Sequence, residues 1–264
     1  MKNILLAGAT ASLVGISSSY GATLFSDDFS YPNGNLVGQG GWVQTSSTAS
    51  PIQVAGGAAA LGTSGQDIYS PLVSSLSLSA GPSFYYGLAL NVSAAQATGD
   101  CFVHFTPTAG DSISFFGQTF IKSSGAGFVL GYLEVSGGTV NYGSTVLSFN
   151  TNYRLVVAYN NVSGPLNDTA SLYVNPSDPR VEGNNTAYLT DTWTSATAEP
   201  TAIAALNLRQ GTAANSPTLT VDFLSAGDAF SAAGSFSPVP EPSTWALFGA
   251  GVIGLGLVIR RKAK

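Results

Sequence analysis

Apolar and polar residues alternate along much of the interior of the chain. From Ser83 to Val92 every second residue, beginning with Phe84, is apolar, so one face of the segment is apolar. An alternation with a period of two residues is typical of a half-buried β-strand. Segments with this alternation or with a strand-like composition are 23–29, 83–92, 101–106, 113–121, 127–135, 139–149, 154–159, 170–174, 201–209 and 218–224. They predict an all-β body over residues 23–232, folded as a single antiparallel β-sandwich.

Turn signals separate the predicted strands. Gly137-Gly138 stands between two of them and indicates a two-residue hairpin. Residues 175–200, which include Trp193, depart from the alternation and are predicted to form a long loop.

The N-terminus has the layout of a secretory signal peptide. Lys2 supplies a positive charge, residues 4–16 are uncharged and mostly apolar, and small residues lead up to Ala22. The apolar stretch is too short to span a bilayer, which takes roughly 20 residues. We therefore predict that residues 1–22 direct the chain to the export translocon and are removed by signal peptidase.

The C-terminus has the layout of a single transmembrane helix. After a linker at residues 233–239, Trp245 marks one border of an uncharged stretch that ends at Ile259. The basic residues that follow are Arg260, Arg261 and Lys262. By the positive-inside rule this cluster stays in the cytoplasm, so the body lies outside the membrane. Small residues at a spacing of four, which let another helix approach closely, are Ala246, Ala250 and Gly254.

The sequence Val239-Pro240-Glu241-Pro242 stands at the start of this segment. A Pro-Glu-Pro motif, an apolar helix and a basic tail in this order over residues 240–264 resemble the PEP-CTERM sorting signal of Gram-negative bacteria. The resemblance implies recognition by an exosortase, a membrane protease that processes such tails. It also implies passage through the inner membrane to the cell surface or the medium, and a link to biofilm and extracellular polysaccharide.

The body carries a second resemblance. Residues 25–36, followed by Gly40-Gly41-Trp42, are similar to the opening strand of concanavalin A-like jelly-roll domains. Residues 153–159, followed by 170–176, resemble the paired central strands of the laminin-G-like members of that group, and residues 219–223 resemble the closing strand. The resemblance implies a jelly-roll sandwich.

Charge excludes one class of partner. Only 9% of the residues are charged, and the body carries thirteen carboxylates against four basic residues. The four are Lys122, Arg154, Arg180 and Arg209. Nucleic-acid binding requires a basic surface, so the body is not expected to bind nucleic acid.

The expected catalytic motif is missing. Glycoside hydrolases with a related sandwich place an acid and a nucleophile about 5 Å apart on alternate residues of one strand. The glutamates of the body, Glu134, Glu182 and Glu199, have no carboxylate two residues away. We predict a body that is not an enzyme; the alternative is a secreted carbohydrate-active enzyme with an unrecognised site.

Cys101 and His104 are the remaining candidates for nucleophilic chemistry. In a regular strand, residues three apart point to opposite faces, so the two are predicted not to meet. We interpret Cys101 as a small buried residue. His104 is interpreted as an ordinary residue on one face of the sheet.

No cofactor is predicted, and calcium is the one metal that the pattern allows. Asp27 and Asp28 in the first strand and Asp222 in the last become neighbours if these strands pair. The favoured alternative is that they are solvated aspartates.

Three aromatic residues, Tyr31, Trp42 and Trp193, lie in loop-like contexts and could stack on sugar rings. The alternative is packing beneath the loops. A glycan-binding body and a purely structural one both remain open from the sequence.

Overall fold

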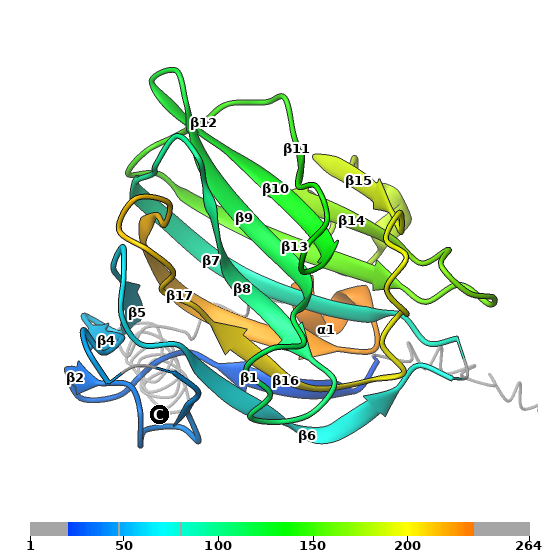
Figure 1. The fold of residues 1–264 in the computed structure, drawn as a ribbon, viewed down its shortest axis with the longest axis horizontal. Coiled ribbons are helices and arrows are strands. Elements are labelled where there is room, and N and C mark those ends of the chain that lie inside the picture. Colours follow the sequence, from blue (N-terminus) through cyan, green and yellow to red (C-terminus); the bar gives the residue numbers. More distant parts are fainter. Residues whose placement is uncertain (1–20, 47, 80, 235–264) are drawn as a thin grey trace, which may run out of the picture.

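Two antiparallel β-sheets packed face to face make up the body (Figure 1). The structure is a computed structural model that describes residues 21–46, 48–79 and 81–234. The strands are β1 (Thr23–Asp27), β2 (Gly34–Asn35), β3 (Val43–Gln44), β4 (Gln53–Ala55), β5 (Ala58–Leu61), β6 (Ile68–Ser77), β7 (Phe84–Ala94), β8 (Asp100–Thr106), β9 (Phe116–Ser124), β10 (Gly127–Val135), β11 (Asn141–Tyr142), β12 (Leu147–Ser148), β13 (Asn152–Asn160), β14 (Thr169–Val174), β15 (Leu189–Thr192), β16 (Ala202–Leu208) and β17 (Thr218–Gly227). Helical turns are η1 (Glu182–Asn184) and α1 (Phe230–Gly234).

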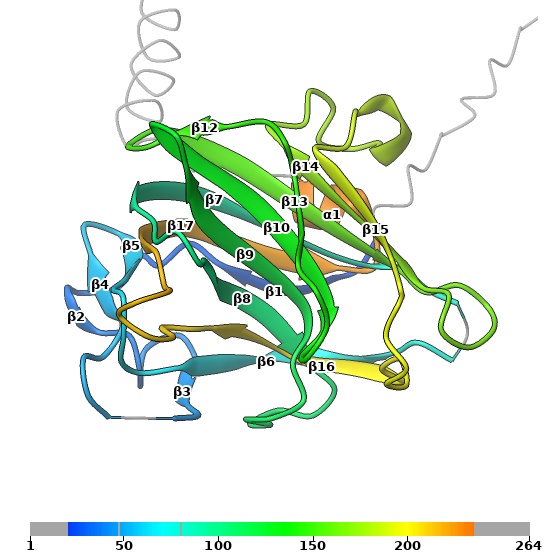
Figure 2. The same ribbon diagram turned by 45° about the horizontal axis from the view of Figure 1, so that its top comes forward.

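The chain passes repeatedly between the two sheets. Sheet A has the order β15-β14-β13-β7-β17-β5-β4-β2, with β1 also paired to β17. Sheet B has the order β11-β10-β9-β8-β16-β6-β3, with β12 also paired to β10. Figures 1 and 2 show β8, β9 and β10 of sheet B in front of β7 and β17 of sheet A. Strands that alternate between two packed antiparallel sheets form a jelly-roll sandwich, so the predicted fold class is confirmed.

The core fills the space between the sheets. On sheet A, the apolar face of β7 is at most 1% exposed, as its alternation predicts. Its residues are Phe84, Tyr86, Leu88, Leu90 and Val92. The facing side chains of sheet B include Phe105, Phe128 and Tyr132. The polar row described below lies on the opposite, outer face of sheet B.

The strand pairs behind the second resemblance are present. β13 pairs with β14 over Leu155–Val174 to Asn160–Thr169. The first and last strands also pair, with Asp27 opposite Leu224.

Two long predicted segments differ from the structure. The segment 139–149 forms only β11 and β12, two-residue pairs on β10, instead of one strand. Gly138 donates its N–H to the carbonyl of Val135 at 3.4 Å, so the turn consists of Ser136 and Gly137, one residue earlier than predicted. The predicted loop 175–200 contains η1 and the edge strand β15, which pairs with β14.

The sequence pattern missed β2 to β6. In β4 and β5 alanines dominate, and the signal lies in Gly56-Gly57 between them, whose φ values of 63° and 83° fit a two-residue hairpin turn. Strand β6 contains Pro71, which argues against a central strand. Since only the two-residue β3 covers its far side, most of β6 is an edge strand, where proline is tolerated.

The alternation predicted for 101–106 is wrong at one point. The register of β8 against β9 shifts between Cys101 and Val103. Because of this irregularity Phe102 and Val103 both join the core. Cys101 and His104 therefore share the outer face, although the regular pattern places them on opposite faces.

A second, smaller apolar cluster covers the outer face of sheet A. Phe230 and Ala233 of α1 pack there against Val156, Ala158 and Tyr173. Ala233 and Gly234 are thus part of the packed body, which extends two residues beyond the predicted boundary at 232.

Several predictions concern segments that the structure does not describe. The predicted signal peptide covers residues 1–22, of which only 21 and 22 are described, and the predicted bounds of the sorting signal, 240–264, lie outside the described residues altogether. Among residues 21–234 as described, no helix is long and apolar enough to cross a membrane.

Candidate functional site

A row of uncharged polar side chains crosses the outer face of sheet B. Tyr69 of β6 pairs with Asn207 of β16, and Asn207 pairs with His104 of β8. On β9, Gln118 pairs with Leu133 of β10. We call Tyr69, Asn207, His104 and Gln118 the polar row.

His104 and Gln118 are neighbours across an irregular part of the β8–β9 pairing. The flanking pairs are Val103 with Thr119 and Phe105 with Phe116. These pairs leave His104 beside Gln118. Both side chains point outward, since the residues on either side of His104 and the Thr119 hydroxyl, which contacts the Tyr86 hydroxyl at 2.6 Å, face the core.

The β8–β9 loop, residues 107–115, lies over the row. At Gly110, an added Cβ would lie 3.4 Å from the Tyr69 hydroxyl, which places this part of the loop on Tyr69. The ring of Phe115 lies over His104, with 4.2 Å between the ring centroids. The carboxylate of Asp111 accepts the N–H groups of Ile113 and Ser114 and so holds the turn in the loop.

Burial keeps His104 uncharged. Its side chain is 2% exposed, and burial, followed by the positive charge of Arg209, lowers the pKa of His104 from 6.5 to about 3, although Asp111 acts in the opposite direction. At neutral pH the imidazole is therefore a neutral hydrogen-bonding group.

Cys101 and His104 do meet, contrary to the prediction. The Cys101 sulfur lies 4.0 Å from His104 Nδ1. The prediction that Cys101 is buried is correct. Burial raises the pKa of the Cys101 thiol well above its usual range, so the thiolate that a nucleophile requires is disfavoured.

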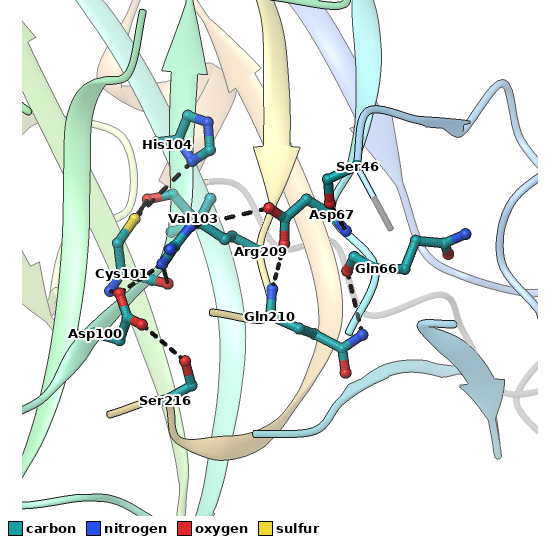
Figure 3. A network of polar contacts seen from close by, with 10 residues as sticks. All are labelled: Ser46, Gln66, Asp67, Asp100, Cys101, Val103, His104, Arg209, Gln210 and Ser216. Carbon is teal, nitrogen blue, oxygen red and sulfur yellow. Dashed lines mark hydrogen bonds and ion pairs between the residues drawn. The ribbon is translucent and has the colours of Figure 1, made fainter. Parts of the chain in front are cut away.

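A charged cluster lies beside the row, near the ends of β6, β8 and β16, and Figure 3 shows it together with His104. Arg209 lies between Asp100, at 2.5 Å, and Asp67, at 4.0 Å. Asp100 also accepts the hydroxyl of Ser216 at 2.9 Å, and Asp67 accepts the N–H of Gln210 at 2.8 Å. The cluster ties together the ends of β8, β16 and the segments before β6 and β17.

The chemistry of this cluster is that of a clamp. One guanidinium pairs with both carboxylates, whereas acid and nucleophile in a glycoside hydrolase must each reach the sugar. Burial raises the pKa of Asp67, but hydrogen bonding to Gln210 and the charge of Arg209 favour its ionised form.

Both candidate tryptophans are buried, which corrects their assignment to sugar stacking. Trp42 is 1% exposed and donates its indole N–H to Asp27 at 2.6 Å. Trp193 is 4% exposed and stacks on Phe116. Neither offers a ring face to solvent, and packing beneath loops describes both.

Tyr31 remains a prediction for sugar stacking. Its side chain is partly buried against the main core. At Gly40, an added Cβ would overlap the Tyr31 hydroxyl, so glycine is needed for this contact.

The three candidate calcium ligands do not form one group. Asp27 is 5% exposed and uses its carboxylate for Trp42 and for the N–H of Phe29 at 2.7 Å. Asp28 and Asp222 are exposed. Within the described part of the chain no group of three or more His, Cys, Asp or Glu side chains could hold a metal ion.

A cleft of about 710 Å³ lies between loops at one end of the sandwich. Val162 and Leu166 line it, together with Glu199. One Glu199 oxygen accepts the N–H groups of Asn167 and Asp168 and so holds the neighbouring loop. This cleft is the main alternative location for a ligand.

The sequence pattern did not single out Tyr69, Gln118 or Asn207. Each is an ordinary strand residue in sequence, and only the pairing of β6, β16, β8 and β9 brings them together. The sequence does contain one partial signal for this site, which is a polar residue with an apolar residue on each side within a predicted strand. Asn207, between Leu206 and Leu208, is an example.

Comparison with known proteins identifies the C-terminal segment. Residues 238–262 match the family model of the PEP-CTERM protein-sorting motif. This match confirms the predicted resemblance to a PEP-CTERM sorting signal, and Val239-Pro240-Glu241-Pro242 lies within it. The motif implies an exported protein processed by an exosortase and directed to the cell envelope or surface. A search of curated proteins found no match.

Solved structures resemble the body in fold at low identity. The CBM2 module of the evolved Dit of Lactobacillus casei BL23 phage J-1 is 12% identical, with 78% of this chain and 95% of that chain covered and a TM-score of 0.48. The carbohydrate recognition domain of Emp47p is 11% identical, with 81% and 100% covered and a TM-score of 0.47. A glycosyl hydrolase family 16 protein from Mycobacterium smegmatis is 9% identical, with 78% and 100% covered and a TM-score of 0.45. The functions in these names belong to those proteins and are not transferred to this chain.

Proposed function

We propose that the body is a non-catalytic module that binds extracellular polysaccharide through the outer face of sheet B. The protein would be delivered by its sorting signal to the cell surface or medium, where it would join a polysaccharide matrix. In this function the sandwich is a scaffold, and the ligand contacts the polar row and the loop above it.

The observation that carries this proposal is the polar row itself. Four uncharged hydrogen-bonding side chains lie in line across four strands of one sheet face, and one of them, the half-buried Tyr69, also offers an aromatic ring. Sugar rings present hydroxyl groups at their rim and an apolar face, which hydrogen-bonding side chains and aromatic rings complement. A purely structural surface protein has no need to place polar side chains in line on a covered sheet face.

Binding can be tested with the full chain purified in a mild detergent. We expect it to sediment with insoluble polysaccharide from the producing cells, and Tyr69→Ala to weaken this binding about fivefold or more, because the row loses its half-buried aromatic end. Val162→Ala, in the end cleft, is the matched control and should bind as the wild type does. If Val162→Ala lost binding while Tyr69→Ala bound as well as the wild type, the ligand site would lie in the end cleft instead.

The second candidate is a carbohydrate-active enzyme, favoured by the two carboxylates, Asp67 and Asp100, that lie on either side of Arg209 beside the row. Incubation with the same polysaccharide should release no new reducing ends. Release that is abolished by Asp67→Asn would establish an enzyme and refute the non-catalytic proposal.

A further inference from the structure

Two buried side chains at the centre of the polar row have unused hydrogen-bonding atoms. His104 is 2% exposed and Gln118 is 4% exposed. The Nε2 atom of each has no hydrogen-bond partner among the residues described. A buried polar group without a partner is unfavourable, and folded proteins contain few of them. Two such atoms on adjacent strands of one face indicate a partner that comes from outside the chain.

Phe115 packs against His104 and is partly exposed. Its ring packs on the imidazole of His104, and its backbone carbonyl accepts the N–H of Ser136 at 3.3 Å. Nearby in the same loop, Ile113 is 81% exposed, and Gly110 has a φ of 80°. The ring of Phe115 is thus held at the surface of a glycine-containing loop, unlike Phe116, which belongs to the core.

The charges around the row favour an uncharged ligand. Arg209 is paired with Asp67 and Asp100, and Lys122 lies 3.9 Å from the ring centroid of Tyr142. The other basic residues of the body, Arg154 and Arg180, belong to β13 of sheet A and to the loop before η1. With thirteen carboxylates against four basic residues, the body repels polyanions such as uronic-acid polymers.

We propose that His104 and Gln118 form the floor of a subsite for one uncharged sugar residue, and that the ring of Phe115 occupies this subsite in the unbound protein. The inference rests on the proposed polysaccharide-binding function. It specifies the class of ligand and the side chain, Phe115, that fills the subsite when no ligand is bound. On binding, the Phe115 ring swings away and sugar hydroxyls reach the two Nε2 atoms. The Gln118 amide donates, and the neutral imidazole donates or accepts at Nε2 according to its tautomer.

The test compares three variants of the full chain in mild detergent by titration calorimetry with uncharged and uronic-acid oligosaccharides. Phe115→Ala should bind the uncharged ligand about threefold to tenfold more tightly, since the competing ring is gone. Gln118→Leu should bind it about tenfold more weakly, the effect of one net hydrogen bond. Ile113→Ala is the matched loop control and should bind as the wild type does.

Thermal unfolding separates a binding role of Gln118 from a structural one. Because its Nε2 atom has no partner in the unbound protein, Gln118→Leu should keep or raise the melting temperature. A lowered melting temperature with unchanged affinity would make Gln118 a structural residue and overturn the inference.

The remaining outcomes distinguish the inference from the function on which it rests. If the wild type binds but Phe115→Ala and Gln118→Leu bind equally well, or if the uronic-acid ligand is preferred, the subsite is refuted while polysaccharide binding stands. If neither the wild type nor any variant binds either class of sugar, the proposed function fails together with the subsite.

Discussion

The protonation of His104 couples the polar row to the stability of the fold. The groups around this imidazole are Cys101, Phe115, the carboxylate of Asp111 and, at longer range, Arg209. Burial lowers the pKa of His104 to about 3, whereas in the unfolded chain it returns to 6.5. Between these values the unfolded chain binds a proton that the folded protein does not. Stability contributed by the neutral imidazole is therefore present above pH 6.5 and is lost as the pH falls towards 3.

We expect the free energy of unfolding of the wild type to fall by about 2–3 kcal/mol more than that of His104→Gln between about pH 7 and pH 4.5. Urea denaturation at several pH values measures both. Comparison with His104→Gln cancels the pH-dependent contributions of other groups to stability. Among these are Asp67 and Asp168, whose pKa values burial raises, so that they act in the opposite direction. Parallel pH profiles would show that the imidazole is solvated in the folded protein.

Asp27 illustrates how a candidate ligand residue serves the fold instead. Its two oxygens accept the indole N–H of Trp42 and the backbone N–H of Phe29, which has a φ of 52°. Phe29 and Trp42 are both buried and stacked on each other. The carboxylate therefore satisfies two buried donors and fixes a left-handed backbone position in the loop after β1.

Asp27→Ala should destabilise the protein by about 3 kcal/mol, because it leaves two buried N–H groups without acceptors. The exposed neighbour Asp28 is the matched control, and Asp28→Ala should cost less than about 1 kcal/mol. Chemical denaturation measures both changes in the free energy of unfolding.

Calcium added to the chelated protein should leave its melting temperature unchanged. A rise in melting temperature that Asp222→Ala abolishes would instead support the calcium site.

At the scale of elements, α1 shows how closely the last described segment fits the body. The carbonyl oxygen of Ala233 would lie 2.0 Å from a Cβ added at Gly87, so only glycine allows this contact on β7. The same oxygen accepts the Ser225 hydroxyl at 3.2 Å. The segment that precedes the sorting signal is thereby fastened to the outer face of sheet A.

Gly87→Ala should lower the free energy of unfolding by about 2 kcal/mol, since the added methyl group forces α1 away from the sheet. Gly183→Ala, where no atom lies within 4 Å of the added Cβ, is the control and should be nearly neutral. Urea denaturation gives both values. Equal stability of the two variants would mean that α1 does not depend on this contact.

Sequence predicts best the strands in which apolar and polar residues alternate regularly, because the pattern then shows which face meets the core. β7 matches its pattern because its alternate apolar residues, from Phe84 to Val92, all meet the core. The pattern fails where a local irregularity changes the face, as in β8, or where an edge strand tolerates Pro71, as in β6. The register shift in β8 also explains why the meeting of Cys101 and His104 could not be predicted.

The same reasoning explains how much of the site was accessible from sequence. The sorting motif is contiguous, so its residues are recognised without a structure. The polar row draws on four strands, and its members come together only through the pairing of β16 with β6 and β8 and of β8 with β9. His104 was singled out for being the one histidine, but nothing in the pattern linked it to Gln118.

For the whole molecule, we propose that the sandwich recognises a ligand, whereas the sorting motif directs delivery. Two models explain the C-terminal segment. In a plain anchor, apolar length and the basic cluster suffice, and the sequence before them is incidental. In a sorting signal, a protease reads Pro240-Glu241-Pro242. Glu241 is the one charged residue between Asp228 and Arg260, which makes it the specific handle.

The two models differ in what they expect of Glu241→Ala with both prolines kept. Membrane insertion should be unchanged, because the substitution leaves the apolar stretch and the basic cluster intact. Recognition should fail, so the variant should be exported, keep its tail and accumulate in the inner membrane. Cell fractionation locates the protein, and intact mass shows whether Arg260 and Arg261 are still present. Should the variant reach the surface or medium as efficiently as the wild type, and should loss of the exosortase also change nothing, the segment is a plain anchor, and delivery of the sandwich to a matrix needs another route.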